Sequence, residues 1–266
     1  MQQRPGTKNN YNKGTHLGLF KTWKFGTINI RSGKEKDEGA KLYAITKEVS
    51  RAGLLFCCLQ EVRYRNIGSK LITLDSGEKF EFHWCGQKRR RDAGVGMLIK
   101  VHPDIAINHP DVLDPRVMAI NLKIHGFNVR IITAYSPTNS DGSEYQKESF
   151  FRTLNKACIK DQKHQKLIVA GDFNAETGLA KFKSCYDGTN IVQDTYSNDN
   201  GWRLKSFCKG KKLGISSSFF DYTMVDRYTW YSNDNKTKKI NDYVLTEKYV
   251  QQYVTDCIVK LEYDIE

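Results

Sequence analysis

The chain has 266 residues, 39% of them hydrophobic, and carries 42 Lys and Arg against 30 Asp and Glu, for a net charge of +12. This composition excludes a chain that is disordered throughout and suits one large domain or two small ones. The positive charge favours a polyanionic partner, nucleic acid before an anionic membrane; a soluble basic protein without such a partner is the alternative.

The cysteines and the apolar segments bear on the compartment. Seven Cys are scattered without zinc spacing, which indicates free thiols in a reducing compartment. Residues 1–16 are polar and lack the apolar core of a signal peptide, and no window approaches the ~20 apolar residues of a membrane span. We therefore expect a protein that is intracellular and not secreted, without a membrane partner, and with a disordered tail over residues 1–18.

From residue 22 onward, strand-like and helix-like patterns alternate without a repeat or a linker. The predicted order is strand 22–30, helix 40–52, strand 54–59, strand 94–101, strand 117–124, strand 128–135, helix 143–159, a strand from Leu167, a helix near 203–208, and strands near 228–230 and 240–245. A tight His125-Gly-Phe127 hairpin joins two of the strands, and Ser143 is expected to cap the helix that follows it. Mixed strands with interspersed helices predict one α/β domain of layered sheets.

The most informative segment is Lys166-Leu-Ile-Val-Ala-Gly-Asp-Phe-Asn-Ala175. Its apolar run, Leu167 to Ala170, is typical of a strand buried on both faces. Gly171 is expected to end the run, and Asp172 and Asn174 follow two apart, so in extended chain their side chains would point the same way. A carboxylate and a carboxamide at a rigid strand end suit catalysis, although an ordinary Asx turn is the alternative.

Other polar residues stand at or near predicted strand ends. Asn29 lies in the first strand, Glu61 follows the second apolar run, Tyr135 ends a later strand, and Asp242 lies in the last one. Each has an ordinary explanation when taken singly: a strand-end residue, a solvated charge, a core aromatic or a hairpin edge position. Their repeated placement predicts that they converge around one cleft at one end of the packed sheets.

Five short motifs together resemble a known superfamily. They are Thr27-Ile-Asn29, Leu59-Gln-Glu61, Tyr135-Ser-Pro137, Gly171-Asp-Phe-Asn174 and Asp242-Tyr243. In this order they resemble the endonuclease/exonuclease/phosphatase superfamily, which includes DNase I and abasic-site endonucleases. Within it the chain looks most like endonuclease domains of RTE-type non-LTR (LINE-type) retrotransposons, whose relatives are often called craniofacial development protein 2-like. Lys88-Arg-Arg-Arg-Asp-Ala-Gly-Val-Gly96, Tyr228-Thr-Trp230 and Asn241-Asp-Tyr-Val244 support the closer resemblance.

The resemblance implies a fold and an activity. The fold would be a DNase I-like four-layer α/β sandwich over residues 19–266, with two packed mixed sheets flanked by helices. The activity would be hydrolysis of phosphodiester bonds that nicks duplex DNA, with Mg²⁺, or Mn²⁺ in its place, stabilising charge on the phosphoryl oxygens. We expect a monomer in the nucleus, and the basic run Lys88-Arg-Arg-Arg91 is compatible with nuclear localisation.

The resemblance also assigns roles. Glu61 would bind the metal, with Asn29 beside it, and Asp172 would orient or deprotonate the attacking water. Asn174 would contact the phosphate or fix Asp172, and Tyr135 would donate to a phosphate oxygen. Asp242 would be hydrogen-bonded near the metal and the general base.

Basic residues supply the expected DNA contacts. The candidates are Lys236, Lys238 and Lys239, in a predicted hairpin beside the site, and Arg89 and Arg90. A hairpin that leans into the minor groove would respond to groove width and deformability, and phosphate contacts would make binding salt-dependent. A solvated basic surface is the ordinary alternative for each cluster.

One departure limits the expected activity. Relatives complete the catalytic set with Ser-Asp-His on a late loop, followed by a further strand, whereas this sequence reaches Tyr263-Asp-Ile-Glu266 about where that tripeptide should follow. We therefore expect weak or undetectable nicking by residues 1–266. Two alternatives stay open: an abasic-site repair endonuclease of the same fold, and a non-catalytic remnant that binds nucleic acid.

Overall fold

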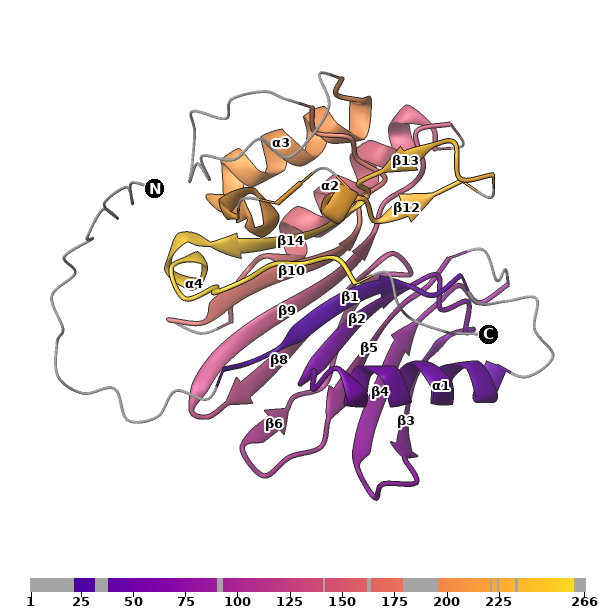
Figure 1. Ribbon diagram of the computed structural model, residues 1–266, viewed down its shortest axis with the longest axis vertical. Coiled ribbons are helices and arrows are strands. Elements are labelled where there is room, and N and C mark those ends of the chain that lie inside the picture. Colours follow the sequence, from indigo (N-terminus) through magenta and orange to yellow (C-terminus); the bar gives the residue numbers. More distant parts are fainter. Residues whose placement is uncertain are drawn as a thin grey trace, which may run out of the picture.

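The computed structural model describes residues 22–31, 38–89, 93–140, 142–161, 164–178, 196–220, 222–223, 225–232 and 234–260. The predicted tail over residues 1–18 and the segment Tyr263 to Glu266 lie outside these residues. Two sheets pack face to face, with α1 on one outer face and α2 and α3 on the other, which confirms the predicted four-layer α/β sandwich (Figure 1).

The first sheet has five strands in the order β1-β2-β5-β4-β3. They are β1 (Phe25–Asn29), β2 (Phe56–Gln60), β3 (Ile67–Thr73), β4 (Lys79–Cys85) and β5 (Val95–Lys100). Helix α1 (Glu38–Arg51) covers its outer face through Leu42, Ile45 and Val49, the stripe that the spacing predicts.

The second sheet has seven strands, in the order β11-β14-β10-β9-β8-β6 with β7 paired to β8. They are β6 (Ile105–Ile107), β7 (Asp111–Asp114), β8 (Val117–Ile124), β9 (Phe127–Tyr135), β10 (Lys166–Asp172), β11 (Leu213–Ile215) and β14 (Asp242–Glu247). Helices α2 (Glu144–Ala157) and α3 (Asp199–Lys211) pack on its outer face. Ser143 caps α2 in a reciprocal capping box with Gln146, as its position predicts.

The core between the sheets consists of apolar side chains from the facing strands. Met97 and Phe56 of the first sheet pack with Met118, Ile131 and Ile168 of the second. Because β2 and β10 also face helices on their other sides, both strands are buried almost throughout, in agreement with their continuous apolar sequences.

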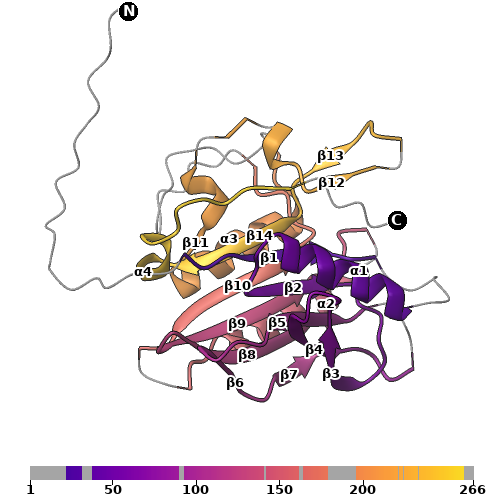
Figure 2. The same cartoon turned by 60° about the horizontal axis from the view of Figure 1, so that its bottom comes forward.

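The smaller elements lie around the second sheet. A hairpin of β12 (Trp230–Tyr231) and β13 (Lys238–Lys239) precedes β14 and extends from the sandwich (Figure 2). The turns η1 (Ser216–Phe219) and η2 (Val225–Arg227) and the short helix α4 (Lys248–Gln251) flank β14 along the chain. No described helix is long and apolar enough to cross a membrane.

One local prediction is confirmed and another needs correction. β10 ends at Asp172, the strand-end position expected for it, and Gly171 ends the apolar run inside the strand. A Cβ at Gly171 would lie 1.9 Å from the carbonyl oxygen of Ala134 on β9. The glycine therefore permits close pairing of β9 and β10. In the β8–β9 hairpin Ile124 pairs with Phe127, so the loop is His125-Gly126 alone, both with positive φ as in a type I′ turn.

The strand pairing brings the motif-bearing ends together. Parallel β1 and β2 align Asn29 with Gln60, which places Glu61 next to Asn29 at the end of the first sheet. Parallel β9 and β10 align Tyr135 with Asp172, and antiparallel β14 starts at Asp242 opposite the same Asp172. One edge of the sandwich therefore presents polar side chains from both sheets.

Candidate active site

Asn29 joins two carboxylates that belong to different sheets. Its Nδ2 donates to Oε1 of Glu61 and to Oδ2 of Asp172, each at 2.9 Å. Its Oδ1 accepts the backbone N–H of Arg31 at 3.1 Å, which fixes the amide with its nitrogen toward the acids. The predicted convergence of Asn29, Glu61 and Asp172 is confirmed.

Glu61 receives two further donors. The hydroxyl of Tyr135 donates to Oε1 at 3.1 Å, so the predicted convergence includes Tyr135. Arg63 forms an ion pair with Oε2 at 2.7 Å. Burial raises the pKa of Glu61, but the donors Asn29, Arg63 and Tyr135 outweigh it, and the pKa is lowered.

Tyr135 lies between Glu61 and a second arginine. The guanidinium of Arg116 sits over the Tyr135 ring, 4.9 Å from its centroid. Burial and the charges of Glu61 and Asp172 raise the pKa of Tyr135 well above its usual range. The phenol therefore keeps its proton at neutral pH and can serve only as a donor to an anion.

Asp172 is buried, and both of its carboxylate oxygens accept hydrogen bonds. The backbone N–H of Asn174 donates to Oδ1 at 2.9 Å, while Asn29 holds Oδ2. Burial raises the pKa of Asp172 more than these donors lower it, and the charge of Glu61 raises it further. Asp172 is therefore an acid whose deprotonation is costly when no cation is near.

Asn174 does not stand beside Asp172 as an extended chain would place it. Its φ is +46°, in the left-handed region, because the chain turns sharply after β10. Its Nδ2 donates to the carbonyl oxygen of Ser136 at 2.9 Å, and its backbone N–H serves Asp172. The predicted same-side orientation is thus wrong, whereas the predicted fixing of Asp172 by Asn174 agrees with the backbone hydrogen bond.

Asp242 adds a third carboxylate to the same edge. It lies opposite Asp172 in the β10–β14 ladder, and its Oδ1 is buried without a hydrogen-bond partner. Burial first, and then the charge of Asp172, raise its pKa well above the usual range. The hydroxyl of Thr229 accepts the Asp242 backbone N–H at 3.2 Å, which ties β14 to the base of the hairpin.

The donor set suits a hard divalent cation. Mg²⁺ binds one or two carboxylates and keeps several waters, and Glu61 and Asp172 supply two carboxylates that share the amide of Asn29. The repulsion between Asp172 and Asp242 and the orphaned Oδ1 are also features that a cation would relieve. Among the described residues, however, no group of three or more His, Cys, Asp and Glu is arranged to hold a metal by itself, so waters and substrate would have to complete its shell.

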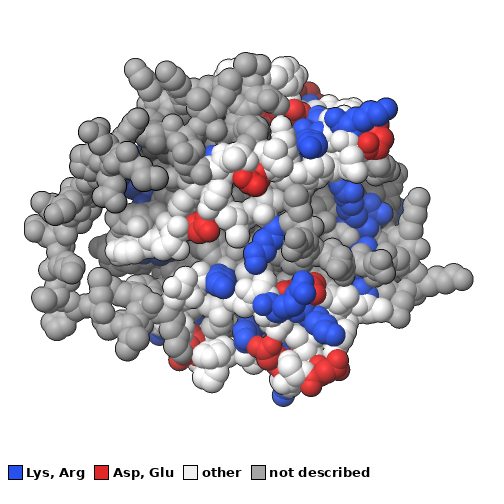
Figure 3. All heavy atoms as spheres, viewed as in Figure 1, with Lys and Arg blue, Asp and Glu red and all other residues white. Residues whose placement is uncertain are grey.

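The side chains predicted to contact DNA differ in their exposure and in the contacts that they already form. Lys236 is 84% exposed, and its Nζ lies 3.9 Å from Oδ2 of Asp234, a long ion pair. Lys238 lies 5.9 and 5.5 Å from the ring centroids of Tyr228 and Tyr231. Lys239 forms a shorter ion pair, with Glu176 at 2.8 Å. Arg89 is exposed on the loop between β4 and β5, and Arg90 lies outside the described residues. Basic side chains gather over the hairpin in the surface view (Figure 3).

Sequence reasoning missed several residues of this edge. Arg63 stands two residues after Glu61, so proximity along the chain was a usable signal. Arg116 reaches the site only through the pairing of β8 with β9, and nothing local in the sequence indicates it. Thr229 stands in the Tyr228-Thr-Trp230 motif, but the sequence assigned it no role in the site.

We predict that Asp242→Asn stabilises the metal-free chain in a pH-dependent way. The carboxyl pKa values are raised on folding, so the folded state loses stability relative to the unfolded state as pH rises above about 4, until pH passes the raised values. The variant removes a carboxyl whose ionisation is disfavoured by burial first and then by the charge of Asp172. Its free energy of unfolding should exceed that of the parent by about 1 to 3 kcal/mol near neutral pH, with little difference at about pH 4.

Urea denaturation with a chelator present measures this difference. Asp75→Asn, which changes an exposed carboxylate in the β3–β4 turn, is the matched control and should show no such trend. A variant that is less stable than the parent at neutral pH would contradict the cost assigned to the buried carboxyl of Asp242.

Comparison with known proteins gives the family. The model of the endonuclease/exonuclease/phosphatase family matches residues 26–254. Craniofacial development protein 2 of Bos taurus is 25% identical over 222 residues, and that of Tragulus javanicus is 24% identical; each match covers 83% of this chain. The chain spans only about a third of the length of these relatives, 35% and 36%.

Solved structures with the same fold are more distant in sequence. The endonuclease domain of TRAS1, a telomere-specific non-LTR retrotransposon, has a TM-score of 0.52 at 13% identity, with 85% of each chain covered. The catalytic domain of Xenopus laevis APE2 has a TM-score of 0.57 at 13% identity, with 85% of this chain and 82% of that one covered. The fold, the order of the motifs and the family match agree, and the chain belongs to the endonuclease/exonuclease/phosphatase family.

Proposed function

We propose that this chain is a Mg²⁺-dependent endonuclease domain that nicks duplex DNA, of the kind found in non-LTR retrotransposons. The observation that carries the proposal is the carboxamide of Asn29 between Glu61 and Asp172. Members of the family generally hydrolyse phosphodiester bonds, and its nucleases generally use divalent metals. The closer assignment is supported by the basic hairpin next to this site and by the net charge of +12.

Glu61 and Asn29 form the cation side of the proposed site. Glu61 would bind the ion, and Asn29 would keep its carboxylate in place. When bound, Mg²⁺ supplies positive charge next to the phosphoryl oxygens. Since its pKa is lowered, Glu61 is ionised at neutral pH and ready to bind a cation without first losing a proton. Arg63 supplies positive charge to the carboxylate through its 2.7 Å ion pair.

Asp172 forms the water side. With Oδ1 and Oδ2 fixed by Asn174 and Asn29, it presents its carboxylate in one orientation, as a group that aligns or deprotonates a water must. Its raised pKa makes it a stronger base than an ordinary carboxylate. Tyr135, which keeps its proton, would donate to a phosphate oxygen as negative charge develops.

The DNA would lie across the edge between the hairpin and the β4–β5 loop. Lys236 and Lys238 at the hairpin and Arg89 on the loop are exposed at this end of the sandwich. Contacts from them to phosphates give affinity without base information, so sequence preference would come from groove shape.

We predict that Glu61→Gln and Asp172→Asn each lower Mg²⁺-dependent nicking of supercoiled plasmid by about 10²–10⁴-fold, because each removes a charged group that acts in the transition state. Both changes keep the size of the side chain. Glu148→Gln on the exposed face of α2 makes the same chemical change away from the site and should leave the rate unchanged.

The assay is run on the 266-residue chain and on a form extended by Ser-Asp-His and a further strand, because the resemblance places part of the chemistry there. A plasmid with abasic sites tests the repair alternative in parallel. DNA binding without nicking in either form would support the non-catalytic alternative and contradict the proposed activity.

We predict that Lys236→Gln and Lys238→Gln each reduce the slope of log affinity against log salt by about 0.9, the value for one released phosphate contact. Lys239→Gln should reduce it less, because the 2.8 Å ion pair of Lys239 with Glu176 is much shorter than the 3.9 Å pair of Lys236 with Asp234. Fluorescence anisotropy with labelled duplex DNA measures the slopes.

Lys123→Gln, at the opposite end of β8, is the control and should not change the slope. Equal slopes for the parent, Lys236→Gln and Lys238→Gln would remove the hairpin from the DNA footprint.

A further inference from the structure

Three asparagine side chains, one from the loop after β9 and two from the start of α3, donate to a single carbonyl oxygen, that of Asn174. The Nδ2 of Asn139 lies 2.6 Å from it, and the Nδ2 groups of Asn198 and Asn200 each lie 3.3 Å away. A carbonyl oxygen has two lone pairs, so this acceptor is used to its limit. None of these three donors belongs to the set that the motifs single out.

The donors are themselves fixed. Asn198 is the N-cap of α3, and its Oδ1 accepts the backbone N–H groups of Gly201 at 2.8 Å and Glu176 at 3.0 Å. Asn139 accepts the backbone N–H of Asn200 through its Oδ1 at 3.2 Å. Asn139 and Asn198 thus have their oxygens occupied elsewhere, and the NH₂ of each donates to the Asn174 carbonyl. The NH₂ of Asn198 also donates to Oε1 of Glu176 at 3.3 Å.

Asn200 is the strongest evidence that these side chains are present for the hydrogen bonds that they donate. It is fully buried, and its Nδ2 donates to the carbonyl of Pro137 at 2.8 Å and to that of Asn174. Its own Oδ1 is buried without a partner. An unpaired buried oxygen costs stability, and a leucine or an alanine at position 200 would avoid that cost. The two hydrogen bonds that the NH₂ group donates therefore explain why an asparagine is present.

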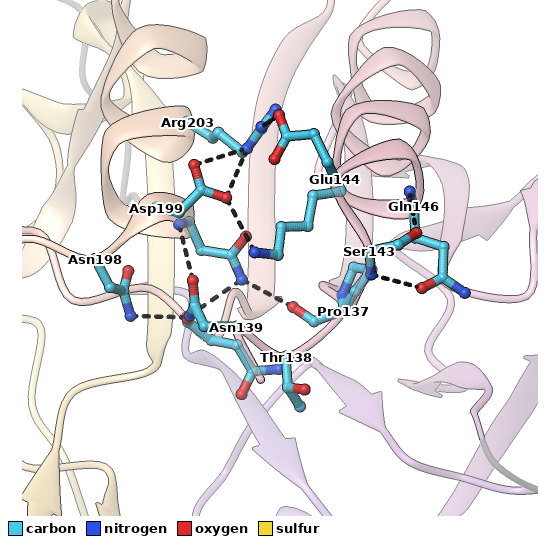
Figure 4. A network of polar contacts seen from close by, with 12 residues as sticks. Pro137, Thr138, Asn139, Ser143, Glu144, Gln146, Asn198, Asp199 and Arg203 are labelled. Atoms are coloured by element: carbon cyan, nitrogen blue, oxygen red, sulfur yellow. Dashed lines mark hydrogen bonds and ion pairs between the residues drawn. The ribbon is translucent and has the colours of Figure 1, made fainter. Parts of the chain in front are cut away.

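The surrounding ion pairs keep the two helices that carry these groups together. Lys147 of α2 is buried and pairs with Asp199 at 3.1 Å, while Arg203 of α3 contacts both Asp199 and Glu144. Figure 4 shows this network above the loop that contains Pro137 and Asn139. The loop after β9 and the start of α3 are therefore held as one rigid support.

The supported residue is the one that holds Asp172. Asn174 has the left-handed conformation that L-residues adopt at a cost, and its backbone N–H donates to Oδ1 of Asp172. Its side chain donates to Ser136, in the loop that the same support fixes. A rotation of the Asn174 peptide would turn that N–H away from the carboxylate.

We propose that Asn139, Asn198 and Asn200 are positioning residues that set the conformation of Asn174 and, through its N–H, the orientation of the Asp172 carboxylate. They act on the reaction without touching metal or DNA. Their effect on the rate of DNA nicking rests on the proposed function, whereas their effect on the conformation of Asn174 does not.

The test uses Asn139→Asp and Asn198→Asp. Aspartate keeps the acceptor oxygen, and at position 198 it remains a good N-cap, but it replaces the donor NH₂ by an oxygen that repels the Asn174 carbonyl. Both positions keep their backbone contacts, so folding should survive. Asn155→Asp is the matched control, because Asn155 also donates its Nδ2 to a carbonyl, that of Phe151 in α2.

A metal-free spectroscopic readout is available because Asn174-Ala175 is the single Asn-Ala pair in the sequence. Labelling Asn at its carbonyl carbon with ¹³C and Ala with ¹⁵N gives one HNCO cross-peak, which reports the Asn174 carbonyl. We expect this carbon to shift upfield in Asn139→Asp and Asn198→Asp, as hydrogen bonds to it are lost, and to stay in place in Asn155→Asp. An unmoved peak in Asn139→Asp would overturn the proposal.

The kinetic arm separates positioning from simple support of the fold. In a form that nicks DNA, Asn139→Asp should lower kcat at least 10-fold with KM unchanged, since DNA contacts are untouched and only the Asp172 orientation changes. A moved peak with an unchanged kcat would overturn the link to Asp172. If the parent does not nick in any form, the proposed function fails, and the carbonyl shift still decides whether the three carboxamides hold Asn174.

Discussion

The carboxamide of Asn29 is the interaction on which the site depends. Asn29 is the last residue of β1 in the first sheet. One of the two carboxylates to which its amide donates, that of Asp172, ends β10 of the second sheet. Hydrogen bonds to charged acceptors contribute about 1.5 to 3 kcal/mol each, enough to fix the separation of the two strand ends. The site and the interface between the sheets are thus held by the same side chain.

The carboxyl groups on this edge differ in the direction in which their pKa values are shifted. Hydrogen bonds from Asn29, Arg63 and Tyr135 lower the pKa of Glu61, whereas Asp172 and Asp242 face each other with raised pKa values. A folded protein tolerates such repulsion when the remaining core is large, and here three apolar clusters surround the polar edge. The free-energy cost of placing Asp172 and Asp242 close together arises at a position where a bound cation would remove it, as expected of a functional site.

Much of this could be predicted from local sequence, because buried strands of this fold are short apolar runs that end in polar residues. Leu167 to Ala170 and Cys57 to Leu59 are such runs, and they fix the positions of Asp172 and Glu61. Strand β3 was missed because it is an edge strand that leaves Ile67 and Leu71 exposed, so its pattern does not alternate in polarity. The left-handed Asn174, the orphaned oxygen of Asp242 and the asparagines around the Asn174 carbonyl arise from contacts between distant segments, and no window of sequence contains them.

The central claim is that Glu61, with Asn29 and Asp172 beside it, forms one cation site between the ends of the two sheets. Anomalous diffraction from a crystal soaked in Mn²⁺ tests it directly, because Mn²⁺ binds the same oxygen ligands as Mg²⁺ and its position is visible by itself. The account predicts a peak bonded to an oxygen of Glu61 at roughly 2.0–2.2 Å, on the side that faces Asp172. Bound Mn²⁺ elsewhere in the crystal, with no peak at Glu61, would contradict it.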